Sequence, residues 1–167
     1  MMAKKDLIFK ILSVTAVILC MVLIFAFSAE NSEESADTSK GISLFITRLF
    51  TPDFESMSDM EKQAVLKSFT GAVRTAAHFS VFALLGFLSA NALNCFVAKP
   101  VIRTISAIIF GFLYAVSDEI HQHFVPGRAC EIKDVAIDTA GVIVGTLFFA
   151  AVLFTINKLT KKKPNGN

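Results

Sequence analysis

The run from residue 118 to residue 128 concentrates side chains that could take part in chemistry. It contains two acids, two histidines, an amide and an arginine, namely Asp118, Glu119, His121, Gln122, His123 and Arg128. The run directly follows an apolar stretch of membrane-spanning length. Ionisable side chains at the edge of hydrocarbon are costly to maintain, so they are candidates for function by default. We therefore expect a functional site here.

Two pairs of polar residues elsewhere in the chain are expected to join this run. Arg74 and His78 begin one apolar stretch, and Asp134 and Asp138 begin another. The members of each pair are four residues apart, which places both side chains on one face of a helix. In a chain that crosses the membrane four times, both pairs and the run 118–128 lie at the same depth. We therefore predict that they converge in one outward-facing polar pocket.

The charges of this pocket leave its chemistry open. Two arginines would face four carboxylates, and a partly dehydrated site with excess acid retains protons, charges a histidine or binds a cation. The first two outcomes give an acid–base pair, and the third gives a metal site. We take Asp118, Glu119, His121 and Asp138 as catalytic candidates, and Arg74, His78, Gln122, Arg128 and Asp134 as ligand-binding candidates. No metal ligand is assigned, because the usual spacings of zinc ligands are absent.

Several of these residues also have a purely structural interpretation. Asp134 would complement the dipole at the start of its helix, and Arg74 would reach the lipid head groups with its long side chain. His78 would be a hydrogen-bonded core residue. Arg128 would hold lipid phosphate in general, or one specific phosphate or carboxylate ligand. Asp138 lies deeper, where an unpaired carboxylate is costly, so a functional role is the preferred interpretation there.

The composition places the chain in a membrane. Of its 167 residues, 54% are hydrophobic and only 18% are charged, and the mean hydropathy is +0.62. The apolar residues come in blocks of about 20, the length that a helix needs to cross a bilayer. We predict an all-α fold, a bundle of four transmembrane helices at residues 11–29, 75–97, 101–120 and 135–156. The net charge of +2 is concentrated at the two termini and indicates no nucleic-acid partner.

The distribution of lysine and arginine predicts the orientation of the chain in the membrane. Basic residues gather before the first span, between the second and third, and after the fourth, at Lys4, Lys5, Lys10, Lys99, Arg103, Lys158, Lys161, Lys162 and Lys163. Four crossings place all three groups on one side, and the positive-inside rule makes that side cytoplasmic. We expect a cytoplasmic N-terminus (1–10), a core of three spans (74–157) and a basic cytoplasmic tail (158–167). The first span is expected to remain as an anchor, because it is longer than the apolar core of a signal peptide.

The acidic segment 30–73 is predicted to face outward and to contain short amphipathic helices. Its apolar residues follow helical spacing at Ile42, Phe45, Ile46 and Leu49, which predicts a helix on the surface of the outer leaflet. Ser58 and Glu61 have the spacing of a capping box, which predicts the start of another short helix before the second span.

Two short motifs predict local geometry near the pocket. Pro126-Gly127 has the residue order of a type II turn, which would reverse the chain toward the fourth span. Gly141 and Gly145 have the spacing that allows two membrane helices to pack closely, so we interpret them as structural.

Three motifs together resemble one known family. The first is Asp118-Glu119-x-His121-Gln122-x-Phe124-x-Pro126-Gly127-Arg128, followed by Asp134, Asp138 and Gly141. The second is Arg74-x-x-x-His78-Phe79, and the third, much weaker, is Phe27-Ser28 followed by Ser35 and Ser39. Over most of its length the chain resembles the VanZ-like family of small bacterial membrane proteins, named after a protein associated with teicoplanin resistance.

The resemblance implies a multi-pass protein of the bacterial plasma membrane that acts at the cell envelope. The expected function is an outward-facing pocket that binds, and in one version modifies, an anionic lipid or cell-wall precursor, lowering susceptibility to teicoplanin-type glycopeptides. Two alternatives stay open, a non-catalytic protein that binds or shields against the antibiotic, and a small transporter of cations or metals. The sequence identifies no cofactor, oligomeric state or reaction, so whether the protein is an enzyme also stays open.

Overall fold

The computed structural model describes residues 2–128 and 130–161, and within them the chain is helical, without a strand. The elements are, in chain order, α1 (Met2–Ala29), α2 (Ser32–Phe50), the 3-10 helix η1 (Phe54–Ser56), α3 (Asp59–Asn94), α4 (Pro100–Gln122) and α5 (Ile132–Lys161). Four helices are long and apolar enough to cross a membrane, at Lys4–Ala29, Asp59–Asn94, Pro100–Gln122 and Ile132–Thr160. The predicted all-α membrane fold with four spans is therefore confirmed.

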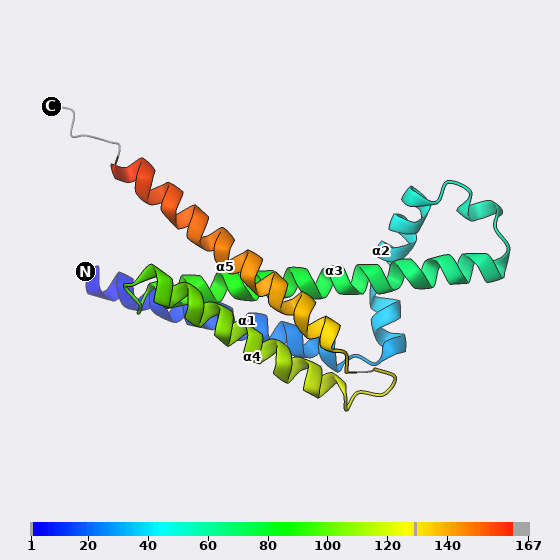
Figure 1. The fold of residues 1–167 in the computed structure, drawn as a ribbon, viewed down its shortest axis with the longest axis horizontal. Helices are drawn as coiled ribbons and strands as arrows, with labels where there is room; N and C mark the ends of the chain where they lie inside the picture. Colours follow the sequence, from blue (N-terminus) through cyan, green and yellow to red (C-terminus); the bar gives the residue numbers. More distant parts are fainter. Residues whose placement is uncertain (1, 129, 162–167) are drawn as a thin grey trace.

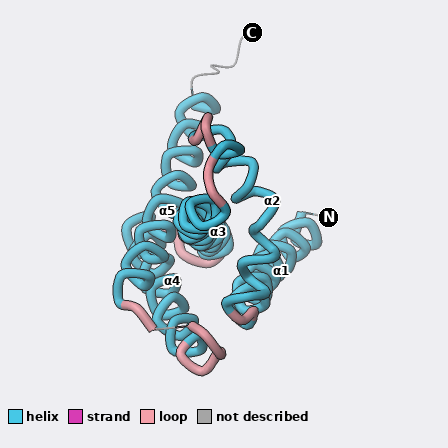
Figure 2. The backbone as a smooth tube through the Cα atoms, turned by 90° about the vertical axis from the view of Figure 1, so that its right-hand side faces the viewer, coloured by secondary structure: helices cyan, strands magenta, loops and turns pink. Residues whose placement is uncertain are grey.

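Helix α3 lies at the centre of the bundle. It is the longest helix in Figure 1, and α5 crosses it while α1 and α4 run beside it. Figure 2, which looks along α3, shows α4 and α5 on one side of it and α1 and α2 on the other. The main core cluster draws on all four spans and includes Ile24, Phe82, Leu85, Ala115 and Val142. Many other large apolar side chains of the spans are exposed, as is usual for helix faces that contact lipid.

Helices α3 and α5 approach each other backbone to backbone. A Cβ atom added to Gly145 would meet the carbonyl group of Ala83, and one added to Gly141 would meet the carbonyl oxygen of Phe79. Both contacts would be closer than real Cβ atoms allow, so only glycine fits at either position. The close packing predicted from these two glycines is confirmed, and it holds the first half of α5 against α3.

Helix α3 begins well before the predicted second span. The Glu61 N–H donates to Ser58 Oγ at 3.4 Å, and the Ser58 N–H donates to the Glu61 carboxylate at 2.9 Å. The predicted capping box is therefore confirmed, but the separate short helix is wrong, because one helix runs without a break from Asp59 to Asn94. Its first turns are polar, so hydropathy does not reveal that they continue into the span.

Helix α2 leaves much of its apolar side exposed. Ile42, Phe45 and Leu49 are 60%, 68% and 64% exposed. The buried side instead carries Ser43 and Thr47, whose hydroxyl groups donate to backbone carbonyls of the same helix at 2.9 and 2.7 Å. An outward apolar face fits the predicted contact with lipid, while the place of α2 at the outer leaflet surface stays a prediction.

The two ends of the bundle differ in chemistry. Figure 1 shows the N-terminus, the α3–α4 connection and the last turns of α5 at one end. The ammonium group of Lys10 lies 5.3 Å from the ring centre of Phe96, which joins the first span to that connection. The basic groups predicted to share one side therefore share one end, although Lys162 and Lys163 lie outside the described residues. The opposite end carries the α1–α2 and α4–α5 connections.

Candidate functional site

Polar residues distant in sequence meet at the end of the bundle where α1 and α4 end and α5 begins. We call this group the polar cluster, and it consists of Ser28, Arg74, His78, Asp118, Gln122, Arg128, Asp134 and Asp138. The side chains of Asp118, Gln122 and Asp138 are almost fully buried. The predicted convergence of the ligand-binding candidates is therefore present in the fold, and each of the four spans contributes to it.

Gln122 connects one acid to two arginines. Its Nε2 donates to Asp118 Oδ2 at 2.9 Å, and its Oε1 accepts from Arg128 Nη1 at 3.0 Å and from Arg74 Nη2 at 3.5 Å. Ser28 Oγ donates to the same oxygen of Asp118 at 2.8 Å. Buried polar groups require partners of this kind. The network fixes the Gln122 amide and thereby holds the two guanidinium groups near each other.

The turn after α4 directs Arg128 back over the bundle. Gly127 has a φ of 76°, and the Arg128 N–H donates to the carbonyl of Val125 at 3.2 Å. Both features are those of the type II turn predicted for Pro126-Gly127, and a positive φ at this point favours glycine. Arg128 Nη2 then donates to the carbonyl of Phe27 at 3.1 Å. The connection after α4 is thus tied to the end of α1.

Arg128 and Arg74 form a locally positive part of the polar cluster. Burial, and after it the charge of Arg74, lowers the pKa of Arg128 from its ordinary value, because both effects disfavour a charged guanidinium. The Nε of Arg128 is buried and has no hydrogen-bond partner among the described residues. An anion bound beside both guanidinium groups would offset their repulsion and accept this unused N–H.

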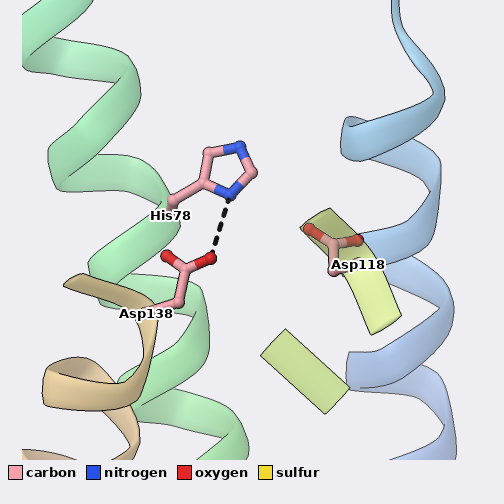
Figure 3. Close-up of side chains that lie close together, drawn as sticks. All are labelled: His78, Asp118 and Asp138. Carbon is pink, nitrogen blue, oxygen red and sulfur yellow. Dashed lines mark ion pairs between the residues drawn. The ribbon is translucent and has the colours of Figure 1, made fainter. Parts of the chain in front are cut away.

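His78, Asp118 and Asp138 bring one imidazole and two carboxylates together from three helices (Figure 3). One nitrogen or oxygen of each lies within 4.8 Å of those of the other two, and His78 Nδ1 lies 4.0 Å from Asp138 Oδ2. A cavity of about 20 Å³ borders His78 and Asp138, and Arg74 and Asp134 line it as well. Because α3, α4 and α5 each supply one residue, no local spacing in the sequence reveals this group.

Glu119 and His121 lie outside the bonded network. Glu119 Oε1 accepts from the Glu131 N–H at 2.6 Å, and its buried Oε2 has no partner within residues 2–128 and 130–161. The His121 ring stacks on Phe25 with ring centres 4.5 Å apart, and its Nε2 is likewise without a partner there. No hydrogen bond or ion pair of the described residues joins His121 to Glu119 or to Asp118, so His121 is not bonded to either of the catalytic candidates nearest to it in the sequence.

A mostly apolar cleft opens beside the polar cluster, between α1, α2 and α3. It has a volume of about 210 Å³ and is lined by apolar residues that include Ile24, Phe27, Ile42, Ala77, Val81 and Phe82. Arg74 and His78 of the polar cluster also line the cleft, together with Glu30. A hollow of this composition suits a molecule with an apolar tail and a charged head.

Sequence reasoning does not identify Ser28 as a site residue. Its side chain is fully buried, and its Oγ lies 3.4 Å from the amide nitrogen of Gln122 as well as in contact with Asp118. The signal in the sequence was the weak Phe27-Ser28 motif at the end of the first span. That motif gives no partner for the hydroxyl group, because its acceptor lies 90 residues further along the chain.

These features define a class, a four-span helical membrane protein whose sequence-distant polar residues form a buried cluster at one end. The model of the VanZ/LLP1 family matches residues 13–155, which include the whole polar cluster. The chain belongs to the VanZ/LLP1 family. No curated protein and no solved structure matches it.

Proposed function

We propose that the protein binds the anionic head group of a membrane amphiphile, a lipid or a cell-wall precursor, between Arg74 and Arg128. The observation that carries the proposal is that both guanidinium groups meet on Gln122 Oε1 beside an apolar cleft. Arginine presents a planar fork of donors that matches phosphate and carboxylate oxygens. The head group would lie on this fork, and the tail would occupy the cleft between α1, α2 and α3.

The position of Arg74 along α3 supports a head-group site. At about 1.5 Å per residue, the helix from Arg74 to Asn94 is about 30 Å long. That length equals the thickness of the hydrocarbon core, also about 30 Å. With Asn94 at one boundary of the hydrocarbon, Arg74 lies at the other, where lipid phosphates and carboxylates are found.

The four catalytic candidates remain candidates for chemistry on a bound head group, namely Asp118, Glu119, His121 and Asp138. The buried Glu119 Oε2 and His121 Nε2 have no hydrogen-bond partner among the described residues, so each is available to a bound head group. A general acid or base must come within hydrogen-bond reach of the reacting group. Asp118, which is bonded to Gln122, and Asp138, which lines a small cavity together with Arg74, are the further candidates for this role.

Removal of either arginine is expected to release the amphiphile. The protein is purified in mild detergent with EDTA, and bound lipids and precursors are identified by native mass spectrometry against the lipid extract of the same membranes. Wild-type protein should be enriched in one anionic class. Arg74→Gln and Arg128→Ala should each lower that enrichment at least about tenfold, because a charge-assisted hydrogen bond contributes roughly 1.5–3 kcal/mol.

Arg48→Ala is the matched control for this experiment. Arg48 is exposed and pairs with Glu55 on the surface, at 2.8 Å, so its removal should leave the enrichment unchanged. Arg74→Gln serves as the variant that keeps the fold, because Arg74 donates only a long bond to Gln122. Equal lipid content in wild-type protein and the Arg74 variant would contradict the proposal.

We also propose that this binding acts at the bacterial cell envelope and lowers susceptibility to teicoplanin-type glycopeptides. The support is the membership in the VanZ/LLP1 family together with the head-group site. The inhibitory concentration of teicoplanin is compared between cells producing wild-type protein and cells producing Arg74→Gln at equal levels. If wild-type protein and Arg74→Gln raise the inhibitory concentration equally, resistance does not depend on lipid binding. That result would favour a shielding role.

The polar cluster is expected to face the outside of the cell and both termini the cytoplasm. Cys130, exposed in the α4–α5 connection, should react with a membrane-impermeant maleimide in intact cells when it is the only cysteine. A cysteine introduced by Lys99→Cys at the other end, again as the only one, should react only after permeabilisation. The reverse pattern of labelling would mean the opposite orientation.

A further inference from the structure

We propose that His78, Asp118 and Asp138 form a binding site for one divalent transition-metal cation, such as Mn²⁺ or Zn²⁺. Imidazole nitrogen and carboxylate oxygen are ligands that these ions accept. The site goes beyond the lipid binding proposed above and does not depend on it, because its three residues exclude both arginines.

The geometry of the three side chains fits a small cation. Figure 3 shows His78 and Asp138 on neighbouring helices facing Asp118 across a gap. Their ligand atoms lie within 4.8 Å of one another. Bonds of about 2.0–2.2 Å to a metal hold two ligand atoms at most about 4.4 Å apart. Small side-chain rotations therefore suffice to bring all three onto one ion.

Asp138 supplies an independent reason to expect a ligand. Its side chain is 3% exposed and receives no hydrogen bond within the described residues, while the His78 nitrogen stands 4.0 Å away, beyond hydrogen-bond distance. A buried carboxylate without a donor is costly in a membrane protein. The cavity of about 20 Å³ that borders both residues has room for a single species the size of a water molecule.

Asp118 is held in the manner of an oriented metal ligand. Ser28 and Gln122 both donate to its Oδ2, at 2.8 and 2.9 Å. No donor among residues 2–128 and 130–161 reaches Oδ1, so that oxygen is free for a cation. Partners that fix a ligating carboxylate in this way commonly tune metal affinity, and here they orient the side chain before any ion arrives.

The charges around the three residues favour a cation of charge two. The carboxylates that act electrostatically on Asp138 are those of Asp118, Asp134 and Glu119. Arg74 and Arg128 oppose these four acids, but both arginines are bonded to Gln122 rather than to Asp138. With all four acids ionised, two negative charges remain after the two arginines are counted, and one divalent cation would neutralise them.

Direct titration tests the site without any lipid. The full-length protein in detergent is first stripped of metal with EDTA and dialysed. It is then titrated with Mn²⁺, and the electron paramagnetic resonance signal of the free ion measures how much is bound. A parallel titration with Zn²⁺ is measured by calorimetry. One ion per chain is expected. Asp138→Asn and His78→Gln should each weaken binding by at least about 100-fold, since loss of a side chain that only hydrogen-bonds to a metal ligand already costs about 10–100-fold.

Two further measurements separate a ligand role from a structural one. Pulsed resonance of the Mn²⁺ complex should show coupling to an imidazole nitrogen, and that coupling should disappear in His78→Gln. Asp59→Asn is the matched control, because it removes an exposed carboxylate from the first turn of α3, the helix that carries His78, far from the three residues. It should keep the nitrogen coupling and one bound ion, with an affinity within about fivefold, the size of a screened charge effect.

The outcomes distinguish this site from the proposed lipid binding. Absence of saturable binding of both ions to wild-type protein, or equal binding by wild-type protein and His78→Gln, would overturn the metal site. If Asp138→Asn fails to fold, the comparison is made with His78→Gln, because His78 is less deeply buried than Asp138. Because the lipid measurement is made in EDTA and the titration without added lipid, either proposal can fail while the other stands.

Discussion

A single methyl group added at Gly145 is expected to destabilise the protein by about 1–3 kcal/mol, the usual cost of overpacking a core. The new Cβ atom would meet the carbonyl group of Ala83 in α3. A backbone carbonyl within a helix cannot rotate away as a flexible side chain would. The two helices must therefore separate along their length. Thermal unfolding of Gly145→Ala in detergent, followed by circular dichroism, measures the effect.

Gly41→Ala is the matched control for this substitution. Gly41 lies within helix α2, and an added Cβ atom there would have nothing within 4 Å. Alanine is the better helix former by up to about 1 kcal/mol, so this variant should be as stable as wild-type protein or slightly more. Wild-type stability of Gly145→Ala would show that α3 and α5 lie further apart than described.

Asp118→Ala is expected to have the second large effect on stability. The Ser28 hydroxyl and the Gln122 amide would both lose their acceptor inside the bundle. Each buried donor left without a partner costs about 1–3 kcal/mol. The unfolding temperature in detergent with EDTA should fall clearly, and the EDTA keeps any bound metal from contributing to the difference.

Asp118→Asn separates the loss of an acceptor from the loss of a charge. Asparagine keeps one carbonyl oxygen that can accept from Ser28 or Gln122, so it should retain more than half of the stability that alanine loses. If Asp118→Ala unfolds at the wild-type temperature or above, the network around Gln122 does not stabilise the folded protein.

The four spans and the shared end of the polar residues follow from the sequence, for a simple physical reason. Blocks of apolar residues must lie in lipid, and an even number of crossings returns the chain to the same side. Arg74, Asp118 and Asp138, each near the same end of a span, are therefore brought to similar depth by topology alone. The glycines at 141 and 145 likewise predict a close helix contact, which α3 supplies.

The choice of side-chain partners does not follow from the sequence. His121 is close in sequence to Asp118, yet its ring stacks on Phe25 of another helix. Ser28, which has no notable neighbour in the sequence, becomes a donor to Asp118. These pairings depend on how the helices are rotated about their axes, and hydropathy carries little information on rotation. Hydropathy also does not show that the polar first turns of α3 belong to the same helix as the span. Helix formation there depends on the capping box rather than on burial in lipid.

The unbroken course of α3 has a mechanical consequence. The part of the helix before Arg74, from Asp59 onward, is about 22 Å long at about 1.5 Å per residue. If Arg74 marks the hydrocarbon boundary, as the proposed head-group site requires, this part projects beyond that boundary. No proline interrupts it, so the tip at Asp59 and the turn bearing Arg74 and His78 belong to one stiff rod. A sideways force on the tip is therefore transmitted to Arg74 and His78, and through them to the wall of the cleft that both residues line.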